Sequence, residues 1–113
     1  MKKAYCPERG DYIWIDFEPQ SGREITKYRP AIVLSAHGQN MFYGMAIVCP
    51  ITSTCKGYPS EVAVQIDGRT SYIKPEQIRS MDWRTRRAKF IAKASVEVLE
   101  EVTENIAALL GIA

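Results

Sequence analysis

The sequence has few residues for metal or thiol chemistry, because it contains one histidine and three cysteines. His37 has no second histidine within helical reach, and Cys6, Cys49 and Cys55 have no Cys-x-x-Cys spacing. A structural zinc site needs closely spaced ligands, and a disulfide framework normally uses an even number of cysteines. We therefore expect free thiols and no metal or other cofactor, while a Cys–His pair would require His37 to meet a cysteine from a distant part of the chain.

Long apolar runs are also missing. Residues 31–34 and 45–49 are typical of those present, and both are far shorter than the roughly 20 residues of a membrane-spanning helix. The N-terminus begins Met-Lys-Lys but lacks the apolar segment of a secretory signal. With 113 residues, 46% of them hydrophobic, the sequence is expected to form one domain over residues 1–113, located in the cytoplasm.

Lys and Arg are absent from residues 94–113, which contain four glutamates. The other 93 residues hold all 15 Lys and Arg and nine of the 13 acidic residues, a net charge of +6. A basic body of this kind favours an anionic partner, and nucleic acid is the commonest one.

Most of the chain shows the period-two alternation of short β-strands. In residues 12–18, Ile13, Ile15 and Phe17 fall on one side, which predicts a strand with one core face and one aromatic–acidic face. Further strands are expected at residues 31–35, 45–49, 61–66, 71–74, 77–83 and 89–92. Asp67-Gly68 predicts a hairpin turn, and residues 37–43 are expected to form a connecting turn or loop.

The last part of the chain changes to helical spacing. Ser95 is a suitable N-cap, Glu97 lies in the first turn, and Gly111 suits the position just past the helix end. These elements together predict a mainly β fold, in which one C-terminal helix packs on a small antiparallel barrel-like sheet.

Two polar residues stand next to predicted strands. Pro30 holds Arg29 extended at a strand start, where its guanidinium could bind phosphate oxygens, although a surface salt bridge is the simpler role. Thr52 follows a buried strand and opens a polar loop over residues 52–59. Its hydroxyl could donate to a phosphate, satisfy the loop backbone, or do both.

Five blocks occur in the order and spacing of one protein family: residues 10–17, 28–35, 48–53, 56–59 and 76–82. Together they resemble the MazF/PemK toxins, and Lys56-Gly-Tyr-Pro59 followed by Glu61 is nearer the MazF branch. The resemblance implies an SH3-like or CcdB-like barrel that forms a homodimer. It also implies sequence-biased, metal-independent cleavage of single-stranded RNA to a 2′,3′-cyclic phosphate, and a MazE-like antitoxin, expected to be an acidic, partly disordered peptide.

The same resemblance assigns catalytic roles. Arg29 would stabilise the charge on the phosphate, with Thr52 as its partner. For the proton acceptor there are two alternatives. Glu24 matches a glutamate of the MazF branch, whereas Lys74 and Glu76 stand where the PemK branch has an arginine and an aspartate.

RNA outside the scissile bond is expected to contact aromatic and polar residues near the loops, because single strands expose their bases for stacking. The expected RNA-binding residues are Trp14, Tyr28, Ser53, Lys56, Tyr58, Lys74, Gln77 and Arg79. Phe42 is a further aromatic candidate, and Trp14 could instead lie in the dimer interface. Arg84, Arg86 and Arg87 would either attract the RNA backbone or form a solvated hairpin end.

Two other functions remain open from the sequence. A CcdB-like toxin would share the fold and bind gyrase without cutting RNA, but those toxins depend on a C-terminal Trp-Gly-Ile. This chain ends Leu110-Gly-Ile-Ala113, without the tryptophan. An inactive homologue that only binds partners is the third alternative, and the presence of Arg29, Thr52 and Glu24 argues against it.

Overall fold

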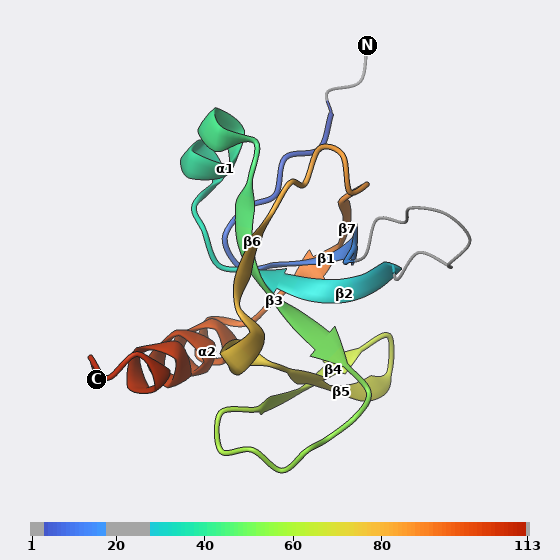
Figure 1. Cartoon of the computed structure of the whole chain (residues 1–113). Coiled ribbons are helices and arrows are strands. Elements are labelled where there is room, and N and C mark those ends of the chain that lie inside the picture. Colours follow the sequence, from blue (N-terminus) through green and yellow to red (C-terminus); the bar gives the residue numbers. More distant parts are fainter. Residues whose placement is uncertain (1–3, 18–27, 113) are drawn as a thin grey trace, which may run out of the picture.

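The computed structural model describes residues 4–17 and 28–112, and its strands form a curled antiparallel sheet (Figure 1). The strands are β1 (Asp11–Asp16), β2 (Tyr28–Val33), β3 (Ala46–Thr52), β4 (Val62–Ile66), β5 (Arg69–Ile73), β6 (Arg79–Met81) and β7 (Lys89–Lys93). Their order is β4-β5-β3-β2-β1-β7, and β6 also pairs with β3. The helices are α1 (His37–Tyr43), the 3-10 helix η1 (Pro75–Gln77) and α2 (Val96–Leu109). The predicted mainly β fold with a C-terminal helix is confirmed.

Strand β3 connects the two parts of the sheet. Its first residues pair with β6, with Ala46 opposite Met81, whereas its last residues pair with β5, with Thr52 opposite Tyr72. Strand β2 runs along the other edge of β3. The sheet therefore turns along the length of β3, and Thr52 emerges next to the β4–β5 hairpin.

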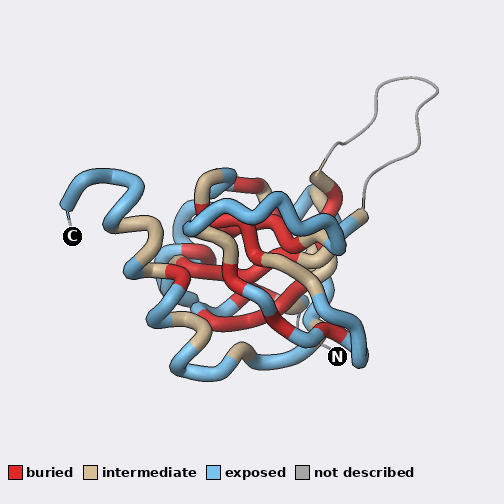
Figure 2. The backbone as a smooth tube through the Cα atoms, turned by 90° about the horizontal axis from the view of Figure 1, so that it is seen from below, coloured by how far each residue is buried: buried red, intermediate tan, exposed pale blue. Residues whose placement is uncertain are grey.

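The central strands separate two hydrophobic cores. Ile13 and Ile15 of β1 pack in one core with Trp83, and Tyr12 packs in the other with Val102 of α2. Figure 2 shows buried residues along the crossing strands at the middle of the molecule. The prediction of a single core face for β1 was wrong, because Tyr12 is only 6% exposed and Asp16 only 7%. Helix α2 packs over the strand face that carries Tyr12, and the Asp16 carboxylate forms an ion pair with the guanidinium of Arg87 at 3.0 Å.

Helix α2 matches its prediction closely. The Ser95 hydroxyl caps its start by accepting a hydrogen bond from the Val98 amide at 3.1 Å. Val102 is fully buried, and Val98, Leu99 and Ile106 pack beside it, so one face of the helix closes the core that contains Tyr12. Within the described ranges, the structure contains no helix long and apolar enough to cross a membrane.

Residues 37–43 form helix α1, so the prediction of a loop there was wrong. The helix has no side-chain N-cap and it ends at Gly44, which adopts a left-handed conformation with φ of 70°. Its stability comes from Asn40, which is fully buried. The Asn40 side-chain amide donates to the carbonyls of Pro7 at 2.9 Å and Ser35 at 3.1 Å, and the backbone carbonyl of Asn40 accepts the Trp83 indole N–H at 2.9 Å. Such tertiary contacts have no local sequence pattern.

The β4–β5 hairpin confirms its predicted turn. Asp67 and Gly68 have φ of 51° and 76°, and Ile66 pairs with Arg69 on either side of them. Two consecutive residues with positive φ are typical of the type I′ turn that suits a two-residue hairpin.

We predict that Asn40→Ala lowers the free energy of unfolding by about 1–3 kcal/mol, because the change leaves buried hydrogen-bonding groups unpaired. Urea denaturation followed by circular dichroism measures this effect. Gln39→Ala is the matched control, since Gln39 is exposed on the same helix and its loss is expected to change stability by less than about 0.5 kcal/mol. Equal effects of the two substitutions would contradict the role given to Asn40.

Candidate functional site

A surface pocket of about 660 Å³ lies where the start of β2, the end of β3 and the β4–β5 hairpin meet. Three of the residues predicted to contact RNA line this pocket together, namely Arg29, Thr52 and Ser53. Trp14 of β1 also lines the pocket. The predicted residues thus bring the Arg29 guanidinium, the hydroxyls of Thr52 and Ser53 and the Trp14 ring to one pocket, a set that suits a phosphate joined to a nucleobase.

Arg29 stands on β2 opposite Ile15 of β1, and it is exposed. Its backbone belongs to a strand that continues through Pro30, which also lines the pocket. No ion pair within residues 4–17 and 28–112 includes Arg29. As far as the described residues go, the guanidinium is therefore available to an anion, and the salt-bridge role considered from the sequence has no partner among them.

Thr52 is the last residue of β3 and shapes the turn that follows. Its hydroxyl accepts a hydrogen bond from the Thr54 amide at 3.2 Å and lies 3.2 Å from the Thr54 carbonyl, to which it can donate. The backbone-capping role considered from the sequence is thus present. It leaves the donor role possible, because a hydroxyl proton rotates to suit its acceptor.

Trp14, the aromatic residue of the pocket wall, is stacked on a second aromatic residue outside it. Trp14 stacks on Tyr28, with ring centroids 5.8 Å apart and an interplanar angle of 22°. The guanidinium of Arg87 lies 4.6 Å from the Tyr28 ring, and the Tyr28 hydroxyl donates to the Arg87 carbonyl at 2.9 Å. Trp14 therefore faces the pocket with Tyr28 as its support, and Tyr28 itself is not part of the pocket wall.

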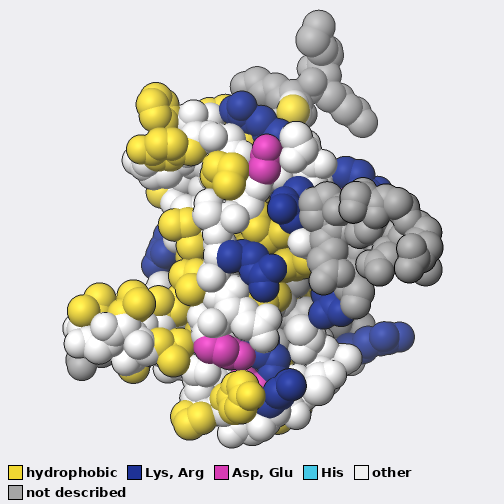
Figure 3. Space-filling model, in the orientation of Figure 1, with side chains coloured by type: hydrophobic (Ala, Val, Ile, Leu, Met, Phe, Trp, Pro, Cys, Tyr) yellow, Lys and Arg dark blue, Asp and Glu magenta, His cyan; other side chains and the backbone are white. Residues whose placement is uncertain are grey.

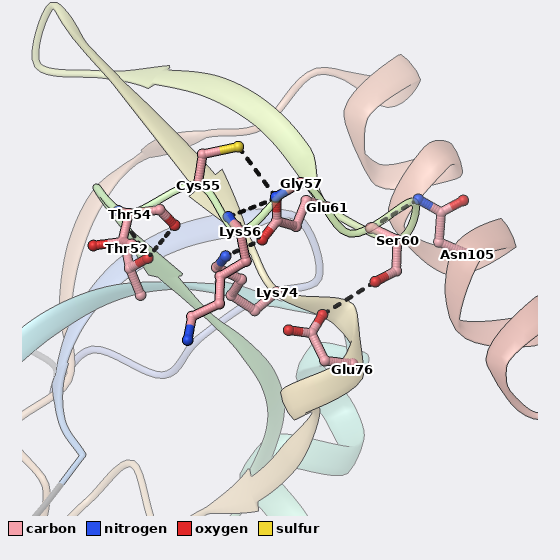
Figure 4. A network of polar contacts seen from close by, with 10 residues as sticks. All are labelled: Thr52, Thr54, Cys55, Lys56, Gly57, Ser60, Glu61, Lys74, Glu76 and Asn105. Atoms are coloured by element: carbon pink, nitrogen blue, oxygen red, sulfur yellow. Dashed lines mark hydrogen bonds and ion pairs between the residues drawn. The ribbon is translucent and has the colours of Figure 1, made fainter.

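Glu61 and Lys74 form an almost completely buried ion pair, with side chains 5% and 3% exposed (Figure 4). The Glu61 carboxylate also accepts hydrogen bonds from the backbone amides of Lys56 and Gly57, each at 3.0 Å. The ammonium of Lys74, followed by the Lys56 amide, lowers the pKa of Glu61 to about 2. The expectation that Lys74 contacts RNA needs correction, because its ammonium is buried against Glu61.

The Glu61–Lys74 pair was missed from the sequence, although a signal for it exists. In a hairpin with a two-residue turn at Asp67-Gly68, residues 62 and 73 pair, as observed. The residues just outside that pair, 61 and 74, then face each other across the two strands. A glutamate opposite a lysine at this register indicates an ion pair.

Of the two carboxylates predicted as proton acceptors, Glu24 and Glu76, the structure describes only Glu76. Glu24 lies outside the described residues. Glu76 belongs to η1 and does not line the pocket. One of its carboxylate oxygens accepts a hydrogen bond from the Ser60 hydroxyl at 3.2 Å, and the other is buried without a partner among the described residues. Asp67, which the sequence indicated only as a turn residue, does line the pocket, together with Arg69.

The remaining predicted RNA-binding residues lie outside the pocket wall. Lys56 and Tyr58 are exposed on the loop after Thr52, and Gln77 is exposed at the end of η1. Arg79 is exposed on β6, with its guanidinium 5.4 Å from the Phe17 ring. The structure thus groups Trp14, Arg29, Thr52 and Ser53, and leaves these four at the periphery.

Comparison with known proteins matches the chain to one family. The family model described as "PemK-like, MazF-like toxin of type II toxin-antitoxin system" matches residues 8–110. The endoribonuclease toxin MazF of Escherichia coli K12 is 37% identical over 111 residues, which cover 98% of this chain and 100% of that protein. The endoribonuclease toxin ChpB of the same strain is 34% identical, over 91% of this chain and 93% of its own length.

A solved structure agrees with this relationship. MazF in the crystal structure of MazE–MazF (Form-II) from Deinococcus radiodurans superposes with a TM-score of 0.88 at 40% identity, covering 97% of this chain and 100% of that chain. The family match spans nearly the whole chain, and it includes every residue of the pocket. This chain belongs to the PemK-like, MazF-like toxins of type II toxin–antitoxin systems.

Proposed function

We propose that this protein is an endoribonuclease toxin that cuts single-stranded RNA in the Arg29–Thr52 pocket, without a metal and with some sequence bias. The observation that carries the proposal is the pocket itself, which joins the Arg29 guanidinium, the hydroxyls of Thr52 and Ser53 and the ring of Trp14. The MazF and ChpB relatives, both named endoribonuclease toxins, support the same activity.

The pocket suits a reaction in which the RNA supplies its own nucleophile. The ribose 2′-OH gives its proton to a base and its oxygen forms a bond to phosphorus, while the bond from phosphorus to the 5′-oxygen breaks and that oxygen takes up a proton. The products are a 2′,3′-cyclic phosphate and a 5′-OH end. Negative charge grows on the phosphate oxygens in between, where the fork of Arg29 and the hydroxyl of Thr52 stabilise it.

We propose that the base is a carboxylate. Glu24 and Glu76 are the two candidates from the family resemblance, and Asp67 becomes a third because it lines the pocket wall. The contact of Glu76 with Ser60 gives that carboxylate a structural task. Glu24 and Asp67 are therefore the stronger candidates.

RNA cleavage is a better proposal than gyrase binding. The relatives that match along the whole chain are named endoribonucleases, and the C-terminal Trp-Gly-Ile of CcdB-like toxins is absent. The pocket also gives Arg29 and Thr52 a joint role, which a purely binding toxin would not require.

An antitoxin of MazE type is the second partner that we propose. MazF of Deinococcus radiodurans has been crystallised with MazE, and its structure superposes on this chain. An acidic peptide would complement the net charge of +6 carried by residues 1–93. Bound over the pocket, it would lower the rate of RNA cleavage. An RNA substrate also agrees with the cytoplasmic location expected from the sequence.

We further propose a homodimer, formed through exposed apolar residues around α1 and on the outer face of β3. Phe42 and Tyr43 of α1 are 79% and 66% exposed, and apolar side chains gather at this end of the molecule (Figure 3). Met45 just before β3 and Ile47 on β3 continue the apolar surface. An apolar surface of this kind is typical of an interface that is covered in solution.

Arg29→Ala is expected to slow RNA cleavage by at least about 100-fold, because it removes the charge that stabilises the transition state. The measurement is a denaturing gel of a randomised single-stranded RNA incubated with protein and EDTA, followed by end-group analysis for the cyclic phosphate. Arg9→Ala is the control, since Arg9 donates to the Leu34 carbonyl outside the pocket. An inert wild-type protein would refute the endoribonuclease proposal, and full activity of Arg29→Ala would refute the site.

Neutral substitutions of the three carboxylates identify the base. We expect Glu24→Gln or Asp67→Asn to reduce the single-turnover rate by about 100-fold or more, the usual contribution of a general base. Glu76→Gln is expected to reduce it less than tenfold. A large loss confined to Glu76→Gln would show that the PemK-like assignment is the correct one.

Ile47→Glu is expected to convert a dimer into a monomer, because it places a charge in the apolar interface. Size-exclusion chromatography with light scattering measures the mass directly. Val96→Glu is the matched control, since Val96 is an exposed apolar residue at the start of α2. A wild-type protein that stays monomeric at high concentration, or a dimeric Ile47→Glu variant, would contradict the proposed interface.

A further inference from the structure

We propose that the buried Glu61–Lys74 pair is a positioning device for catalysis, which holds the loop of residues 53–60 in the shape that completes the pocket. Lys74 would thus support RNA cleavage without touching RNA. The proposal rests on the proposed function and adds positioning residues to it.

The pair is attached to the rigid part of the fold. Glu61 and Lys74 flank the paired residues Val62 and Ile73, at the open end of the β4–β5 hairpin. The Lys74 amide donates to the carbonyl of Pro50 in β3 at 3.0 Å, two residues before Thr52. Both charged groups are therefore fixed relative to β3, the strand that carries Thr52 into the pocket.

The carboxylate of Glu61 binds the middle of the loop, at residues 55–57 (Figure 4). It accepts the backbone amides of Lys56 and Gly57 and contacts the Cys55 thiol at 3.5 Å, so three consecutive residues converge on one side chain. These residues lie outside any strand or helix. The pair thus replaces the backbone partners that regular secondary structure would supply.

A second anchor holds the end of the loop. The Ser60 hydroxyl donates to Glu76, and the Ser60 carbonyl accepts from the Asn105 side chain on α2 at 3.0 Å. Between β3 and these two anchors, residues 53–60 have little freedom to move. This arrangement also explains why Glu76 is directed toward Ser60 and not toward the pocket.

The anchored residues lie next to the pocket wall. Ser53 and Thr54 line the pocket, and Cys55 is the next residue in the chain. Loss of the anchor would let the loop shift and would move these two residues relative to Arg29. Rates of phosphoryl transfer depend steeply on such geometry, since a displacement of about 1 Å can slow a reaction by about 100-fold.

The chemistry of the pair favours this role over acid catalysis by Lys74. The ammonium is buried and bound to a carboxylate whose pKa is about 2, so the ion pair persists at neutral pH. A proton donor for the leaving 5′-oxygen would instead have to reach the substrate.

The test separates positioning from simple stabilisation. Lys74→Met leaves a buried charge unpaired and is expected to lower the melting temperature by about 10 °C or more. The double variant Glu61→Met/Lys74→Met is expected to regain most of that stability, because apolar replacement of a buried ion pair is often neutral. Its kcat is nevertheless expected to stay at least tenfold below wild type, with KM changed less, because the amides of Lys56 and Gly57 still lack their acceptor.

Two further variants complete the design. Lys89→Met, at an exposed lysine on β7, is the matched control, with stability and cleavage close to wild type expected. Lys74→Arg keeps the charge and is expected to restore part of the rate lost in Lys74→Met. If the double variant fails to fold, Glu61→Ala also removes the acceptor of the Lys56 and Gly57 amides, and its cleavage is measured well below its melting temperature.

The outcomes are distinguishable. Wild-type cleavage by the stable double variant would overturn the positioning role and leave the pair purely structural. Amide NMR of the RNA-free protein provides a readout independent of activity, with shifts expected for Lys56 and Gly57 in the double variant; unchanged signals would also overturn the proposal. An inert wild-type protein with shifted amides would instead refute the proposed function while retaining the anchor.

Discussion

The loop beside the candidate site depends on one buried carboxylate. Glu61 is surrounded by the Lys74 ammonium and by two loop amides, so donors of the protein compensate its negative charge. Burying such a group alone costs free energy, and this cost is offset only when every donor is in place. The geometry of residues 53–60 is therefore coupled to the β4–β5 hairpin, and the pocket takes its shape from both.

The sheet explains why the pocket forms where it does. Strand β3 pairs with β6 at its start and with β5 at its end, so the sheet turns and brings the hairpin opposite β2. Two cores hold the central strands from both faces, which keeps Arg29 on β2 and Thr52 on β3 in fixed relation. A phosphate bound between them would meet groups already in position, and such preorganisation is the main source of electrostatic catalysis.

Local patterns predicted most of the fold from the sequence, whereas contacts between distant residues did not appear in it. The Asp67-Gly68 turn and the Ser95 cap act through neighbouring backbone groups, and both were predicted correctly. Helix α1 was missed because Asn40 stabilises it through Pro7 and Trp83. In the site, the grouping of Arg29 with Thr52 followed from family blocks. Lys74 was expected to contact RNA, although the register of the Asp67-Gly68 hairpin places Glu61 opposite it.

The proposed function requires the scissile phosphate to bind between Arg29 and Thr52. The most direct measurement is an NMR titration with a 2′-O-methyl single-stranded RNA, which lacks the nucleophile and stays intact. We predict chemical-shift changes concentrated at the residues of the pocket, and much smaller changes in α1 and at the C-terminal end of α2. Saturable binding that perturbs those helices and leaves the signals of Arg29 and Thr52 unchanged would contradict the account.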